Sequence, residues 1–186
     1  ADEPTAVPLL DGLTALVDQS LIQQEMTSTG EMRFSMLETI RHYLHERLAA
    51  SGEEALLRQR HLRYYVTLAE TAEPALSGPE QGVWLARLEQ EQGNLRAALA
   101  ASKELPDCAH FGLRLATALW WFWWVHGHVS AGRAWLENLL ALTGSTQSTH
   151  AHWHARSTAH DRAAFLASAY GDYQQAQAAS DANLAL

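Results

Sequence analysis

Five aromatic residues in succession form the most distinctive group of the sequence: Trp120, Trp121, Phe122, Trp123 and Trp124. Aromatic faces bind sugars, bases and cations, so such a run could form a stacking platform. On a helix, Trp120, Trp123 and Trp124 fall together while Trp121 points elsewhere, and large aromatic side chains serve most often in cores. We therefore expect core packing for most of the run and a partly exposed Trp121 as the best ligand candidate.

Trp121 is the first of three residues that we select as a ligand or partner surface, the others being Trp135 and His128. His128 and His126 flank Gly127, which is typical of a turn. Further along the chain, His150, His152, His154 and His160 raise the question of a metal site, since imidazole is a common metal ligand. Only His150 and His154 share a helix face, and no Glu follows the first of them at metalloprotease spacing, so we predict no metal site.

No motif for catalysis accompanies these residues. The sequence contains no Gly-x-x-x-x-Gly-Lys-Ser/Thr loop that would hold nucleotide phosphates, and no serine framed by glycines as in a nucleophile elbow. Cys108 follows Pro106 and Asp107 before an apolar helix, without a basic neighbour that would favour its thiolate. We expect neither an enzyme nor a bound cofactor in this chain.

Composition excludes several classes of protein. The chain has 186 residues, 47% of them hydrophobic, which is enough for a core, and its formal net charge of −8 disfavours general binding to nucleic acid. A single cysteine rules out an internal disulfide and a thiolate zinc cage. Residues 1–8 lack the basic start and apolar stretch of a secretory signal, and the most apolar run is shorter than the ~20 residues that span a bilayer. We expect a cytoplasmic protein that contacts no membrane and is a piece of a longer chain.

Hydrophobic periodicity predicts a mainly α protein with one two-stranded ribbon near 20–37. A polar loop at 27–31 joins the two strands of this ribbon, whose Ile22 and Met26 would share a face with Phe34 and Met36. Gly52 is predicted to cap a helix, and Pro74 to stop one. The predicted helices span 9–19, 37–50, 54–73, 79–102, 110–126, 129–142, 150–170 and 172–186.

The second half of the chain repeats itself. Gly127-His128-Val129 and Gly171-Asp172-Tyr173 lie 44 residues apart (127 to 171), and Gly132 and Ala176 occupy equivalent places where a neighbouring helix would approach closely. The segment at 171–176 resembles the turn and second helix of a tetratricopeptide repeat. We expect stacked antiparallel helical pairs, with an apolar face on the last helix that offers itself to a second copy in a weak homodimer.

Several sequence segments resemble those of a known protein family. Leu16 to Ile22, Arg33 to Arg41 and Glu46 to Leu48 look like the second half of the winged helix in bacterial STAND-type regulatory ATPases, the LuxR-like and AfsR-like transcriptional regulators. Gly78 to Leu99 and Gly127 to Glu137 look like the helical segments that follow it there. The resemblance implies a partial winged-helix module over 1–52 and a tetratricopeptide-like array over 53–186.

In that family a nucleotide-binding domain precedes the winged helix, and the array serves as sensor or docking surface. The resemblance therefore implies a non-catalytic regulatory and protein-interaction segment, with ATP bound only in an upstream domain. Its partners would be that domain and a protein or small-molecule effector.

DNA contact by this chain is disfavoured, because the helix before the ribbon carries Asp11 and Asp18 and no basic residue. An alternative function is a small-molecule sensor that binds an apolar or sugar-like effector near Trp121 and Trp135.

Overall fold

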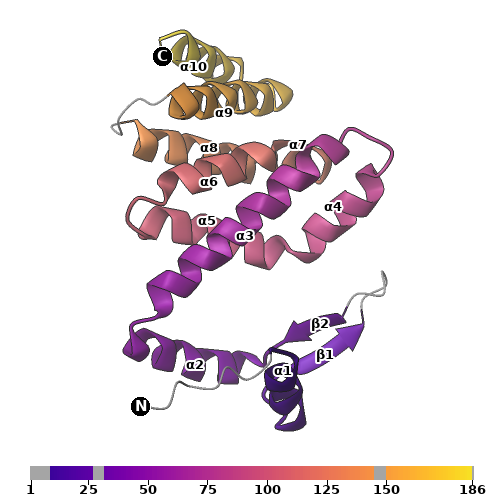
Figure 1. Cartoon of the computed structure of the whole chain (residues 1–186). Coiled ribbons are helices and arrows are strands. Elements are labelled where there is room, and N and C mark those ends of the chain that lie inside the picture. Colours follow the sequence, from indigo (N-terminus) through magenta and orange to yellow (C-terminus); the bar gives the residue numbers. More distant parts are fainter. Residues whose placement is uncertain (1–8, 27–31, 145–149, 186) are drawn as a thin grey trace. The chain divides into compact units, whose positions relative to one another are not determined.

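The computed structural model describes residues 9–26, 32–144 and 150–185. They form two compact units, residues 1–54 and 55–186, each with its own internal contacts. Figure 1 gives the order of the elements along the chain. The expected mainly α fold with one β-hairpin is confirmed.

The first unit contains two helices and a hairpin. Helix α1 spans Leu9–Asp18, strands β1 and β2 span Gln23–Met26 and Met32–Ser35, and α2 spans Glu38–Ser51. The strands are antiparallel, with Gln24 opposite Phe34 and Met26 opposite Met32. Because side chains alternate along a strand, this register puts Met26 and Phe34 on one face, as predicted. The predicted loop at 27–31 lies outside the described residues.

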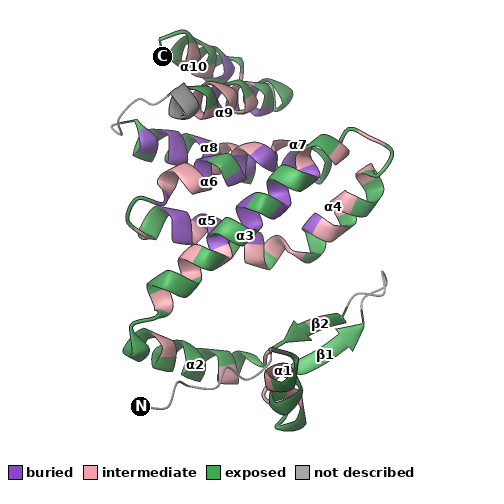
Figure 2. Ribbon diagram, in the orientation of Figure 1, coloured by how far each residue is buried: buried purple, intermediate pink, exposed green. Residues whose placement is uncertain are grey.

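Helix α2 ends where the sequence predicted it would. Gly52 adopts φ +76°, and its N–H bonds the carbonyl of Ala49. A left-handed residue closes a helix at little cost only when it lacks a Cβ atom. Figure 2 shows this unit mostly exposed, and Ile22 is the one buried side chain in its described part.

The second unit is a stack of helices. They are α3 (Glu54–Ala75, from the boundary of the units), α4 (Gln81–Gln90), α5 (Gln92–Glu104), α6 (Ala109–Ala118), α7 (Trp120–Val125), α8 (Val129–Thr143), α9 (His150–Ala169) and α10 (Tyr173–Leu184). Helix α6 packs against α5, α8 and α9, and α9 also packs against α8 and α10. Its core includes leucines from α3, α5, α6 and α8, and Figure 2 shows buried positions on these helices.

The two glycine turns that are 44 residues apart have the same geometry. Gly127 and Gly171 have φ of +72° and +80°. After each glycine the next N–H bonds a carbonyl five residues back, His128 to Trp123 at 2.9 Å and Asp172 to Ala167 at 3.0 Å. This is the Schellman pattern at a helix end. The two turns that the sequence places 44 residues apart (127 to 171) therefore share one backbone geometry.

Three predicted helix limits are wrong. The helix predicted over 79–102 is interrupted at Glu91, and the one over 110–126 at Leu119; both residues have φ near −90° and ψ near 0°. Leu119 separates α6 from α7, which holds the aromatic run. Helix α3 also continues through Pro74 and ends one residue later, at Ala75.

Candidate functional site

In the hairpin unit, the basic residues of the described part lie on β2 and α2. Arg33 stands opposite Glu25 in the ladder, Arg41 pairs with Glu38, and the guanidinium of Arg47 lies over the ring of Tyr43 at 5.6 Å. The hydrogen bond from Arg41 lowers the pKa of the Glu38 carboxyl. These arginines therefore lie on a solvated surface that also carries acidic residues. Any contact of such a surface with phosphate groups would depend strongly on salt.

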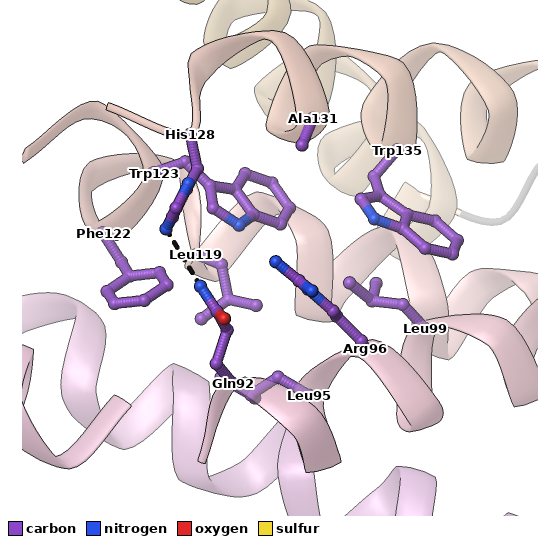
Figure 3. A pocket seen from close by; sticks show the side chains of 10 residues that line it. All are labelled: Gln92, Leu95, Arg96, Leu99, Leu119, Phe122, Trp123, His128, Ala131 and Trp135. Atoms are coloured by element: carbon purple, nitrogen blue, oxygen red, sulfur yellow. Dashed lines mark hydrogen bonds between the residues drawn. The ribbon is translucent and has the colours of Figure 1, made fainter. Parts of the chain in front are cut away.

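In the helical unit, two of the three predicted surface residues line one notch. His128, before α8, and Trp135, on α8, line it together with Gln92, Arg96 and Leu99 of α5. Phe122 and Trp123 of α7 also line it. Figure 3 shows the Arg96 side chain reaching from α5 into the space between Trp123 and Trp135. The notch holds about 30 Å³, which is room for a side-chain tip and not for a separate small molecule.

Polar contacts hold the side chains at this notch in place. The amide nitrogen of Gln92 donates to Nε2 of His128 at 2.9 Å, which is the dashed contact in Figure 3. Lys103 lies over the ring of Trp135, with its Nζ 5.4 Å from the centroid. The lining residues include no carboxylate. Arg96 is exposed and has no hydrogen-bond or ion-pair partner within the described ranges. The notch therefore presents positive charge beside indole faces in a protein of net charge −8.

The aromatic run is only partly arranged as predicted. Phe122 and Trp123 are buried, at 1% and 6% exposure, whereas Trp124 is exposed at 38%. Trp120 and Trp124 both contact the ring of Phe165 of α9 edge-on, which agrees with the expectation that these two share a helix face.

Trp121 lies away from the notch, partly buried against the core. It lines a separate cavity of about 380 Å³ with Trp120 and with residues from α3 and α9. Its ring contacts that of Trp120 edge-on at 5.1 Å. The structure therefore brings Trp135 and His128 together and leaves Trp121 at a different site.

Four residues of these two sites were not predicted from the sequence: Gln92 and Arg96 in the notch, and Glu73 and Arg162 in the cavity. A helical spacing of four links Gln92 to Arg96, which was the available signal for the first pair. Glu73 and Arg162 are far apart in the sequence, and only the fold joins them.

The histidines are placed as follows. His160 is buried at 9% exposure, and this burial, with nearby Arg156, lowers its pKa. His154 lies exposed on α9, and the side chains of His150 and His152 are outside the described part of the chain. Where side chains are described, no three of the residue types that bind metals gather into a possible site. His61 is half-buried beside Tyr65, with ring centroids 4.7 Å apart, and burial lowers its pKa.

Comparison with known proteins gives a family match in the N-terminal unit and an alignment with relatives over 132 residues. Residues 3–49 match the family model of a winged helix-turn-helix domain. The N-terminal unit carries a winged helix-turn-helix domain. The hairpin β1–β2 and helix α2 lie within the matched residues.

Three mycobacterial proteins, one from Mycobacterium bovis and two from Mycobacterium tuberculosis strains, are 38% identical to the chain over 132 residues. Each is named a "putative HTH-type transcriptional regulator". The alignment covers 71% of this chain and 14% of each relative, so the chain spans a small part of their length. No solved structure shows a significant match.

These findings correct one expectation. Direct nucleic-acid contact was disfavoured because α1 is acidic and the chain has a negative net charge. The winged helix-turn-helix match overturns that conclusion, since this domain class is built to contact DNA. Net charge misled because phosphate contacts depend on a local surface and not on the total charge. Separately, no helix in the described ranges combines the length and apolarity needed to cross a membrane.

Proposed function

We propose that this chain is a regulatory segment of an HTH-type transcriptional regulator. Its winged helix-turn-helix domain contributes contacts to DNA, and its tetratricopeptide-like array serves as a docking or sensing surface. The observation that carries the proposal is the presence, in one chain, of a winged helix-turn-helix match and a 132-residue alignment to proteins of that name. The segment itself is non-catalytic in this proposal.

The hairpin and α2 supply the proposed DNA contacts. Arg33 lies on β2, and Arg41 and Arg47 lie six residues, or about 1.7 turns, apart on α2. Three arginines beside several glutamates would position the domain on phosphates without strong affinity. We expect weak, salt-sensitive binding.

Fluorescence anisotropy with a labelled random-sequence duplex tests this contact between about 50 and about 200 mM salt. Affinity should fall with a log–log slope of roughly −2 to −3, about 0.9 per phosphate contact. The triple variant Arg33→Gln, Arg41→Gln, Arg47→Gln should lose binding, while the control Arg60→Gln, an exposed arginine of α3, should not. No binding at low salt, or an unchanged triple variant, refutes the DNA contact.

The exposed apolar surface of the first unit supports a larger assembly, as the STAND-type resemblance implies. Large hydrophobic side chains stand exposed on both helices and on the hairpin: Leu10, Leu16, Met26, Met32, Phe34, Leu37, Tyr43 and Leu44. Such a surface serves typically in contacts with other parts of a protein. In the proposal it packs on an upstream nucleotide-binding domain, which would hold ATP, in a cytoplasmic regulator.

The notch at Arg96 and Trp135 is the proposed docking surface of the array. Arg96 and Lys103 place positive charge around an indole, so the complementary partner is an acidic protein segment whose carboxylates reach these cations. Binding of a labelled Asp/Glu-rich peptide should fall at least about tenfold in Arg96→Gln, Lys103→Gln. Arg60→Gln again provides the matched control. Equal binding by both variants would remove the notch from the proposal.

A further inference from the structure

The cavity that contains Trp121 is a second site of the helical unit, independent of any DNA contact. It measures about 380 Å³, within the range of ligand pockets, and three helices line it. Glu73, Pro74 and Ser77 come from the end of α3 and the turn after it, Trp120 and Trp121 from α7, and Arg162 from α9.

Two indoles shape this cavity for a flat ring. Trp120 and Trp121 meet edge-on with centroids 5.1 Å apart, and Pro74 adds apolar surface from α3. Phe165 supports Trp120 from α9 at 5.1 Å, also edge-on. Aromatic surfaces fixed in this way favour stacked or edge-on contact with another planar ring.

Glu73 and Arg162 bring an acceptor and a donor to the same cavity. Arg162 Nη2 lies 3.7 Å from Glu73 Oε1, too far for a hydrogen bond, and its guanidinium stacks over Trp120 at 4.2 Å. Partial burial raises the pKa of the Glu73 carboxyl, although Arg162 and the Trp120 indole N–H act in the opposite direction. Both members of this pair thus retain capacity for hydrogen bonds with a ligand.

Acceptors are scarce around this cavity. Trp121 Nε1 and Arg162 Nε are buried, and neither has a hydrogen-bond partner within the described part of the chain. Buried N–H groups normally have a partner, and both of these belong to side chains that line the cavity. An acceptor on the ligand would therefore satisfy a donor that the protein leaves unpaired.

The charges at the cavity balance. Glu73 faces Arg162, and the adjoining cavity, also lined by Glu73, contains Glu70 in a two-bonded pair with Arg114 at 2.7 and 2.8 Å. A neutral molecule therefore fits this environment better than a strong anion or cation.

We propose that this cavity binds an uncharged, planar heteroaromatic molecule that presents a donor beside an acceptor, as the edge of a nucleobase does. Its ring contacts Trp120 and Trp121, Glu73 accepts from its N–H group, and Arg162 donates to its carbonyl or ring nitrogen. The proposed ligand is a free small molecule.

Calorimetric titration of the whole chain with guanosine and cytidine tests the proposal, with indole as the apolar ring that lacks this edge. At least one nucleoside should bind saturably at one site and about tenfold or more tighter than indole. The indole N–H resonance of Trp121 should also shift as it gains an acceptor. If neither nucleoside gives saturable heat, or if indole binds as tightly, the proposal is wrong.

Variants distinguish contacts to the hydrogen-bonding edge of the ligand from contacts to its ring. Glu73→Gln and Arg162→Gln should each weaken nucleoside binding about tenfold and leave indole unaffected. Trp121→Leu should abolish both. The controls Glu80→Gln and Trp153→Leu alter exposed residues that do not line the cavity, so they should bind as the unmodified chain does. Thermal unfolding verifies that each variant is folded, and an equal loss in the controls overturns the assignment.

Discussion

The hydroxyl of Tyr65 donates a hydrogen bond of 2.6 Å to Oε2 of Glu91. Glu91 is the residue between α4 and α5, and the same oxygen accepts a bond of 2.6 Å from Asn94. Burial, reinforced by Glu91, raises the pKa of Tyr65, so its hydroxyl keeps its proton and remains a donor. This bond ties the middle of α3 to the interruption of the helix that follows.

Removing the Tyr65 hydroxyl should destabilise the protein. Tyr65→Phe leaves the Glu91 carboxylate short of a partly buried donor, and we expect a loss of about 1–2 kcal/mol in the free energy of unfolding. Urea denaturation measures it. Tyr64→Phe alters an exposed neighbour and should change stability by less than about 0.5 kcal/mol. Equal losses of stability in the two variants would show that the Tyr65–Glu91 hydrogen bond does not stabilise the protein.

Adding a methyl group at Gly132 should be costly. A Cβ atom there would lie 2.3 Å from Cε3 of Trp123, so Gly132→Ala must push α8 away from a buried indole. We expect a loss of about 1–3 kcal/mol on thermal or urea unfolding. Gly93→Ala meets nothing within 4 Å inside α5 and should instead stabilise the protein by about 0.5–1 kcal/mol. Two changes of the same sign would contradict this account of the packing.

Asp172 has two separable roles at the start of α10. Its Oδ1 accepts from the backbone N–H of Gln175 at 3.2 Å, and its Oδ2 accepts from Arg133 of α8 at 2.8 Å. Asp172→Ala loses both and should cost about 1–2 kcal/mol, whereas Asp172→Asn keeps a good cap and should cost less than about 1 kcal/mol. Hydrogen exchange of the α10 amides reports the difference, and identical protection in both variants would rule out a capping role.

Acid should destabilise the helical unit through its buried histidines. Burial lowers the pKa of His160 and of His61, so below the ordinary value of about 6.5 the unfolded chain binds protons more readily than the folded one. Their stabilising contribution is complete above that pH and is lost as pH falls through their folded pKa values. The raised pKa of Glu73 acts in the opposite sense, since it favours the folded state at low pH and loses that effect as pH rises.

Comparing each variant with the unmodified chain isolates one group. Between pH 7 and 5, the free energy of unfolding should fall less steeply with pH in His160→Gln than in the unmodified chain. The two slopes should differ by at most about 1.4 kcal/mol per pH unit. Urea denaturation at several pH values measures this slope. His154→Gln changes an exposed histidine and serves as the control. A steeper dependence of stability on pH in His160→Gln would mean that folding does not lower the pKa of His160.

Local chemistry determined much of this protein from the sequence alone. The hairpin register follows from alternation, so the spacing of Met26 and Phe34 was enough to place them on one face. Gly52, Gly127 and Gly171 could be placed at helix ends, because a left-handed backbone selects for a residue without a Cβ atom. Gly132 was likewise identifiable as a close approach through its place in the repeat.

Only the tertiary structure decided where helices break and which side chains meet. Glu91 interrupts its helix while bonding Tyr65, which comes 26 residues earlier, and Trp120 and Trp124 of α7 meet Phe165 of α9. Glu73, Trp121 and Arg162 likewise share a cavity although they lie on three helices. Periodicity reports which face of one helix is apolar, but it contains no information on the partner helix. Cavities and long-range hydrogen bonds depend on that partner, and so they appear only when the helices pack.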